Sequence, residues 1–183
     1  MPILLLALGA AAIWYLSSIT DLAPNSQKED TNYLSDSTLV SLPVTDSIGW
    51  PYYYSKGSPS TPWDSGSDGI DCGGYALMVS VRIGNISPSC PDMNTATIAN
   101  NCDKIEIGSQ MPGDFAYYPG HIMVVCSEPL DANGHSAVIG ASGGTRTTLG
   151  NNPNAKVKVF STPNYRDDFV CYMRWKPDFK YKV

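Results

Sequence analysis

The sequence lacks any cluster of basic residues. Its 183 residues contain 12 Lys and Arg against 17 Asp and Glu, and the formal net charge is -5 at pH 7. Proteins that bind nucleic acids need concentrated positive charge to neutralise phosphates. We therefore expect no nucleic acid partner, and we take the overall acidity as a matter of solubility.

The sequence also lacks CxxC pairs and contains only 2 histidines. Structural zinc sites are commonly built from such cysteine pairs, so we expect no metal and no cofactor. The five cysteines are Cys72, Cys90, Cys102, Cys126 and Cys171. Cys90 and Cys102 flank a polar loop and could form a disulfide if the domain lies outside the cytoplasm. Two free thiols are the alternative.

A second domain is not expected, because a chain of 183 residues holds one ordinary core and a tail. An apolar share of 43% can fill that core, while 16 Gly and 14 Pro indicate many turns. This composition favours short strands and loops over a helical bundle.

The N-terminus is apolar. Residues 2–16 carry no charge, and a weaker apolar run continues to Ile19. A helix over the whole run spans about 27 Å, close to the ~30 Å hydrocarbon core of a bilayer. The segment has no basic n-region, and Trp14 and Tyr15 suit a membrane interface. We predict an N-terminal apolar helix that anchors the protein to a membrane through residues 2–19. A cleaved signal peptide and a buried helix are the alternatives.

The chain divides into three segments. Residues 1–19 form the predicted anchor or signal-anchor, residues 20–45 a polar linker, and residues 46–183 the domain that carries the chemistry. The linker shows no sustained helical or strand period and is expected to behave as a flexible chain, although Tyr33, Leu34, Leu39 and Val40 could still pack on the domain.

One helix and several short strands are predicted in residues 46–183. Asp71 is a good N-cap for a helix that ends at Ile83, before Gly84, and apolar residues on nearly all sides predict a buried, central position. Turn signals then separate five strand-like runs. These runs are residues 115–118, 121–126, 137–142, 156–160 and 169–175. We predict an α+β fold in which the central helix packs on a five-stranded antiparallel sheet.

Cys72 is the first candidate catalytic residue. It follows Asp71 and precedes Gly73 and Gly74, so its sulfur is expected at the helix N-terminus with open space around it. Helix N-terminal amides and the helix dipole stabilise a thiolate, and a lowered pKa makes a cysteine nucleophilic. The same N–H groups could hold an oxyanion. A small buried hydrophobe is the structural alternative.

His121 is the candidate base. It opens a predicted strand directly after Pro119 and Gly120, where it could lie beside the start of the central helix. A histidine in this place can accept the thiol proton and form a Cys/His pair for acyl transfer. A structural histidine is the alternative.

Four sequence blocks frame Cys72 and His121 and resemble the signature blocks of NlpC-type cell-wall peptidases. In order, the blocks are Gly49-Trp50-Pro51-Tyr52, Asp71-Cys72-Gly73-Gly74, Met111-Pro112-Gly113-Asp114-Phe115 and Gly120-His121-Ile122. Residues 173–175 look like the closing strand of that family, so the resemblance covers about residues 48–175.

This resemblance implies a papain-like core with Cys72 as nucleophile and His121 as general base. It places Tyr52 near the nucleophile, where we expect it to bind substrate together with Asp71 and Gly73; an aromatic plug of the core is the alternative for Tyr52. Asp114 matches a family turn and is expected to cap backbone amides.

The sequence departs from this family at the third catalytic position. Family members usually place His, Asn or Gln there to orient the imidazole, and the matching slot falls on Gly140. His135, in the preceding hairpin, could substitute as a third catalytic residue. Ser142, two residues on along the same strand face, is a second candidate and a possible substrate contact. A water molecule or a backbone carbonyl is the remaining alternative.

The resemblance implies a cysteine endopeptidase that hydrolyses peptidoglycan stem peptides, commonly beside D-glutamate. Its expected location is the membrane, facing the periplasm or cell wall, or a virion. Two other functions stay open. One is an amidase of the N-acetylmuramoyl-L-alanine type, and the other is a catalytically degenerate, wall-contacting component of a phage virion.

Overall fold

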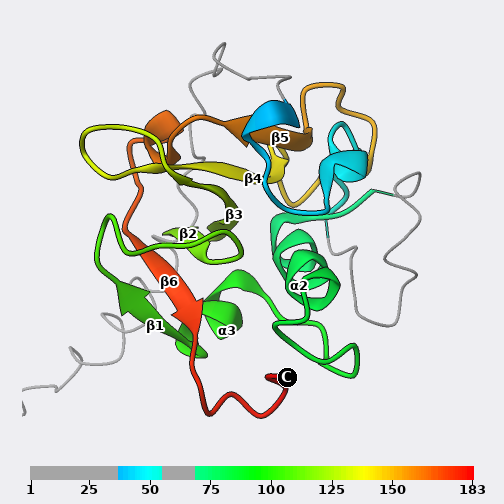
Figure 1. The fold of residues 1–183 in the computed structure, drawn as a ribbon. Helices are drawn as coiled ribbons and strands as arrows, with labels where there is room; N and C mark the ends of the chain where they lie inside the picture. The colour runs from blue at the N-terminus through cyan, green and yellow to red at the C-terminus, as the bar shows by residue number, and fades with distance from the viewer. Residues whose placement is uncertain (1–36, 55–68) are drawn as a thin grey trace, which may run out of the picture.

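The computed structural model describes residues 37–54 and 69–183 (Figure 1). The predicted anchor, residues 1–19, and most of the predicted linker lie outside the described residues. Among the residues that are described, none belongs to a helix with the length and apolarity needed to cross a bilayer.

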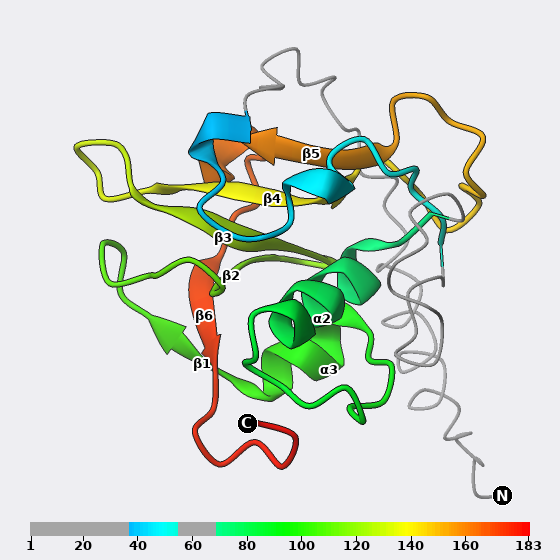
Figure 2. The same ribbon diagram turned by 45° about the vertical axis from the view of Figure 1, so that its right-hand side comes forward.

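The described chain is α+β, with one antiparallel sheet and two α-helices. In chain order the elements are η2 (Ser37–Leu39), η3 (Thr45–Ser47), α2 (Cys72–Arg82), α3 (Thr95–Asn100), β1 (Cys102–Ile105), β2 (Phe115–Tyr118), β3 (His121–Pro129), β4 (Ser136–Ser142), β5 (Lys156–Phe160), η4 (Pro163–Tyr165) and β6 (Cys171–Trp175). The strand order across the sheet is β1-β6-β2-β3-β4-β5. Figure 2 shows α2 and α3 together on one side of this sheet.

The sheet has six strands, so the prediction of five strands was wrong by one. The additional strand, β1, pairs only with β6 and forms one edge of the sheet. Its middle residues, Asp103 and Lys104, are exposed. A four-residue strand with two exposed charged residues carries too little apolar alternation to be recognised in a sequence.

The central helix is confirmed. The side chain of Asp71 caps α2 by accepting a hydrogen bond from the N–H of Gly74 at 2.8 Å. Gly84 follows the helix with φ +74, a conformation that ends helices and that glycine adopts without a steric penalty. The helix is buried over Cys72 to Ser80 and packs on β3 and β4.

The predicted hairpins are also confirmed. Pro119 and Gly120 connect β2 to β3, and Tyr118 pairs directly with His121 across this turn. Proline followed by a glycine with positive φ is the residue pair that a type II turn favours. In the β3–β4 connection, the Asp131 carboxylate accepts hydrogen bonds from the backbone N–H groups of Asn133 and His135.

Alternation along the strands creates two apolar layers. Ile122, Val124 and Cys126 belong to the core that α2 covers. Met123 and Val125 belong to a smaller cluster on the opposite face, against which Tyr165 and Phe169 pack. By the same alternation His121 lies on the face of Met123, while Cys72 approaches from the face of α2.

The packed chain begins before residue 46, the predicted start of the domain. Val44 is fully buried, and Leu39, Val40 and Leu42 pack against the core. The backbone N–H of Ser41 also donates to the carbonyl of Cys126 at 2.8 Å. The end of the predicted linker, residues 20–45, is therefore part of the globular unit.

The block around Asp114 is structural, as predicted. Its carboxylate accepts a hydrogen bond from the N–H of Met111 at 2.7 Å and two from the Arg174 guanidinium, each at 2.7 Å. These contacts join the turn before β2 to β6. All five cysteines lie among the described residues, and all are free thiols, including Cys90 and Cys102.

Candidate active site

Cys72 lies where the helix meets the sheet. It is the first residue of α2 and is 8% exposed. The backbone N–H groups of Ile122, Gly73 and Cys72 itself lie near its sulfur and lower the pKa of the thiol. Ile122 is the second residue of β3. Cys72 is therefore next to the start of β3, where His121 lies.

The thiol of Cys72 is not activated in this arrangement. Burial raises its pKa to about 12, and the charge of Asp71 adds to the rise. The three N–H groups lower the pKa but do not compensate for the loss of water. The expectation that the helix N-terminus lowers the pKa of Cys72 is therefore wrong for this structure. The loss of hydration raises the pKa of the thiol more than the backbone amides lower it.

His121 is buried and neutral. It is 6% exposed, and its Nε2 lies 2.9 Å from the hydroxyl of Tyr165. Burial, with a smaller effect of the nearby Arg166 charge, lowers the pKa of His121 to about 3 against the opposing effect of Asp168. In this structure Cys72 is therefore a neutral thiol and His121 a neutral imidazole.

Tyr165 is a site residue that sequence reasoning missed. It ends η4, between β5 and β6, and its hydroxyl lies 2.9 Å from Nε2 of His121. Burial raises the pKa of Tyr165, Ser142 lowers it, and a charge on Cys72 adds to the rise. No motif marks this residue, because its contact with His121 joins positions 44 apart through the fold.

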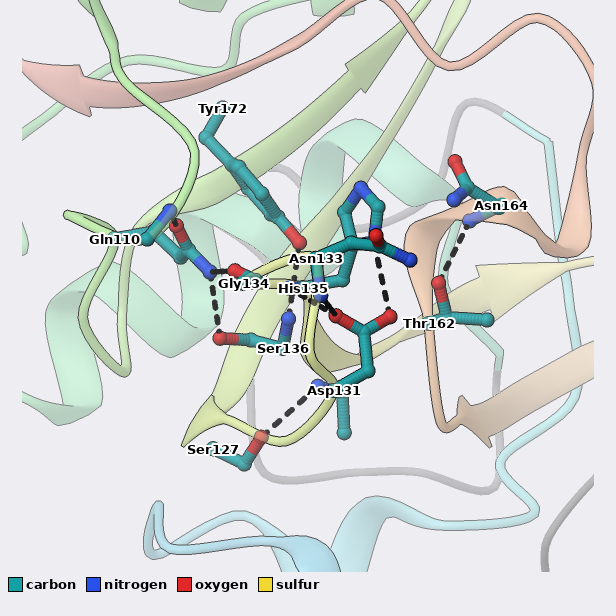
Figure 3. Close-up of polar contacts among 12 residues, drawn as sticks. Gln110, Ser127, Asp131, Asn133, Gly134, His135, Ser136, Thr162, Asn164 and Tyr172 are labelled. Atoms are coloured by element: carbon teal, nitrogen blue, oxygen red, sulfur yellow. Dashed lines mark hydrogen bonds and ion pairs between the residues drawn. The ribbon is translucent and has the colours of Figure 1, made fainter.

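His135 does not join the site. His121 begins β3, whereas His135 lies beyond the other end of that strand, just before the Pro129–Ser136 pair. Figure 3 shows its ring held inside the hairpin, where Nδ1 lies 3.0 Å from Oδ2 of Asp131. The edge of the His135 ring also packs against Phe169. Its proposed role as third catalytic residue is therefore wrong, since the hairpin carries it away from His121.

Ser142 lies near Tyr165. It is 4% exposed, sits at the end of β4 and lowers the pKa of Tyr165. At the neighbouring slot, a Cβ built on Gly140 would lie 2.7 Å from the sulfur of Met123. Met123 thus fills the space in which a family-type orienting side chain would have to sit.

Tyr52, Asp71 and Gly73 lie around Cys72. Tyr52 is buried, and burial together with the charge of Cys72 raises its pKa. The Asp71 carboxylate caps the helix by accepting a hydrogen bond from the N–H of Gly74. A Cβ on Gly73 would lie 3.0 Å from the carbonyl of Met93, so Gly73 is packed against a loop rather than beside open space. Its contribution to the site is its N–H group.

Comparison with protein-family models, with curated proteins and with solved structures finds no match to this chain. A functional assignment therefore depends on the geometry around Cys72 and on the four sequence blocks. The chemistry available there is acyl transfer: a thiol, an imidazole held through one nitrogen, and backbone N–H groups that can stabilise negative charge.

Proposed function

We propose that this protein is a cysteine endopeptidase that hydrolyses stem peptides of bacterial peptidoglycan, with a papain-like core. One observation carries the proposal: the sulfur of Cys72 lies near the backbone N–H of Ile122, the residue after His121, and Nε2 of the His121 ring lies 2.9 Å from the hydroxyl of Tyr165. The substrate class is supported by the sequence blocks around Tyr52, Cys72, Asp114 and His121.

The reaction proceeds through a thioester. As the sulfur of Cys72 attacks the peptide carbonyl carbon, the thiol proton passes to His121. The carbon–nitrogen bond then breaks, and His121 returns that proton to the leaving amine. Water next attacks the thioester and gives one proton to His121, which passes it to the departing sulfur. The backbone N–H groups of Cys72 and Gly73 stabilise the oxyanion in both steps.

The site must open for this reaction. Burial is the largest cause of the raised pKa of Cys72 and of the lowered pKa of His121. Both shifts oppose proton transfer from sulfur to imidazole, because each favours the neutral form. Entry of a polar peptide and water moves both pKa values back toward ordinary ones and makes the transfer less costly.

The same two shifts favour a second candidate function. A buried thiol and a buried neutral imidazole are also what a wall-contacting module without catalysis would retain from an active ancestor. In that case Cys72 is a packed side chain, and the fold serves only to bind envelope material.

The proposal includes attachment to a membrane through residues 2–19, with the domain facing the periplasm or cell wall. Attachment would confine cleavage to wall material within reach of the segment that follows the anchor.

Digestion of purified peptidoglycan, with mass analysis of the products, separates the candidates. The endopeptidase releases fragments with a new amine inside the stem peptide. An amidase instead separates whole stem peptides from the glycan. Binding without any released product is the result expected of the wall-contacting module, and it would overturn the proposal.

A further inference from the structure

We propose that Tyr165 is the positioning residue for His121, replacing the side chain that strand β4 does not supply. The hydroxyl of Tyr165 lies 2.9 Å from Nε2 of His121, and the contact joins η4 to the first residue of β3. This inference rests on the proposed function for its catalytic meaning, but the contact itself can be tested without catalysis.

Strand β4 cannot supply an orienting side chain. Positions 140 and 142 share a face with Met123 and His121 by the strand alternation. A Cβ at Gly140 would lie 2.7 Å from the Met123 sulfur and 3.3 Å from its methyl carbon. The other position holds Ser142, which has a shorter side chain than Tyr165 and lies near the Tyr165 hydroxyl, whose pKa it lowers.

Tyr165 is itself held firmly, as a positioning residue must be. Its ring stacks on Phe160 with centroids 3.8 Å apart and an interplanar angle of 7°. The turn before it is fixed by the Tyr118 hydroxyl, which donates to the carbonyl of Pro163 at 2.8 Å. The turn after it is fixed by Arg166, which lies over the Tyr118 ring and forms a two-point ion pair with Asp168.

The proposed reaction requires one tautomer of His121, and the contact with Tyr165 can stabilise it. For Nδ1 to accept the proton of Cys72, the ring hydrogen must be on Nε2. Nε2–H then donates to the Tyr165 oxygen. Ser142 lies near the same hydroxyl and lowers the pKa of Tyr165.

The variant that isolates this contact is Tyr165→Phe, because it keeps the ring and its stacking on Phe160. The matched control is Tyr75→Phe, which also removes a buried hydroxyl bonded to a serine, namely Ser47 at 2.8 Å. Thermal unfolding and circular dichroism verify that both variants fold.

Two measurements follow. Nitrogen-15 NMR of the histidine side chains in the full chain, assigned with His135→Gln, is expected to show His121 with hydrogen on Nε2 in the parent and in Tyr75→Phe. In Tyr165→Phe we expect a mixture of tautomers.

With peptidoglycan as substrate, kcat of Tyr165→Phe is expected to fall about 10- to 100-fold with little change in KM.

The outcomes separate this inference from the proposed function. Hydrogen on Nδ1 in the parent, or an unchanged tautomer and kcat in Tyr165→Phe, would overturn the role of Tyr165. If the parent releases no product, the endopeptidase proposal fails. The NMR result then still decides whether Tyr165 fixes the His121 ring.

Discussion

Met123 occupies the space that a side chain at position 140 would need. A Cβ built on Gly140 lies 2.7 Å from the Met123 sulfur, closer than van der Waals contact allows. The two residues face each other on adjacent strands, in line with the pairing of Val124 with Ile139. The packing of Met123 therefore favours glycine at position 140 of β4. The contact that orients His121 comes instead from Tyr165 in η4.

This packing predicts coupled effects of two substitutions. Gly140→Ala is expected to lower the free energy of unfolding by about 1–3 kcal/mol, because the added methyl group overfills the layer. In the double variant Met123→Ala/Gly140→Ala the space is free. Its loss of unfolding free energy should therefore be smaller than the sum of the losses in Met123→Ala and Gly140→Ala, by about 1 kcal/mol or more. Urea unfolding of the parent, the two single variants and the double variant measures these losses. Strictly additive losses would contradict the contact.

The buried imidazole predicts acid sensitivity. The pKa of His121 is lowered to about 3, whereas an unfolded histidine titrates near about 6.5. Between these values the unfolded state binds a proton that the folded state does not, so the free energy of unfolding falls as the pH falls. From about pH 7 to about pH 5 this loss amounts to about 2 kcal/mol.

His121→Gln removes that loss and keeps a group that can bond Tyr165. Its free energy of unfolding should therefore decline less than that of the parent over the same pH interval. His135→Gln is the control, since it retains His121 and should keep the parental decline. Equal declines in the parent and in His121→Gln would show that His121 is not held neutral by burial.

The raised pKa of Cys72 predicts slow alkylation. Cysteines activated at helix N-termini have pKa values of about 3.5–7.5 and react with iodoacetamide in mildly acid solution. Burial raises the pKa of Cys72 to about 12, so its alkylation rate in the resting protein should keep rising with pH and show no plateau near neutrality. Peptide mass analysis gives the rate, with half-buried Cys171 as internal reference. A plateau below about pH 7 would contradict the neutral resting pair.

The Asp114–Arg174 contact predicts a change in stability without a change in chemistry. Asp114 is 5% exposed and accepts hydrogen bonds from Met111 and Arg174. Asp114→Asn should lower the free energy of unfolding by about 1–3 kcal/mol. Under conditions where the variant is fully folded, its rate on peptidoglycan should equal that of the parent. Lost activity at parental stability would instead place Asp114 in the site.

Features with strong local signals could be predicted from the sequence. Asp71 and Gly84 mark the ends of α2 through capping and a left-handed residue. Pro119 and Gly120 specify the turn that places His121 at the start of β3. These features depend on neighbouring residues and on the backbone conformations that those residue types prefer. Both can be read from the sequence.

Features that depend on distant contacts could not be predicted. β1 is stabilised by pairing with β6, which lies far along the chain, and its own sequence carries little pattern. Tyr165 reaches His121 only because stacking on Phe160 and the bond from Tyr118 fix its turn. His135 was misplaced because proximity in sequence to β4 says nothing about which end of the hairpin faces the helix.

The measurement that tests the central claim most directly compares the rates at which the parent, Cys72→Ala and Cys171→Ala release stem-peptide fragments from purified peptidoglycan. Circular dichroism and thermal unfolding verify that both variants retain the fold of the parent. We predict that the parent and Cys171→Ala release fragments with new internal amines at similar rates, and that Cys72→Ala releases none. Release by Cys72→Ala at the parental rate would contradict the account.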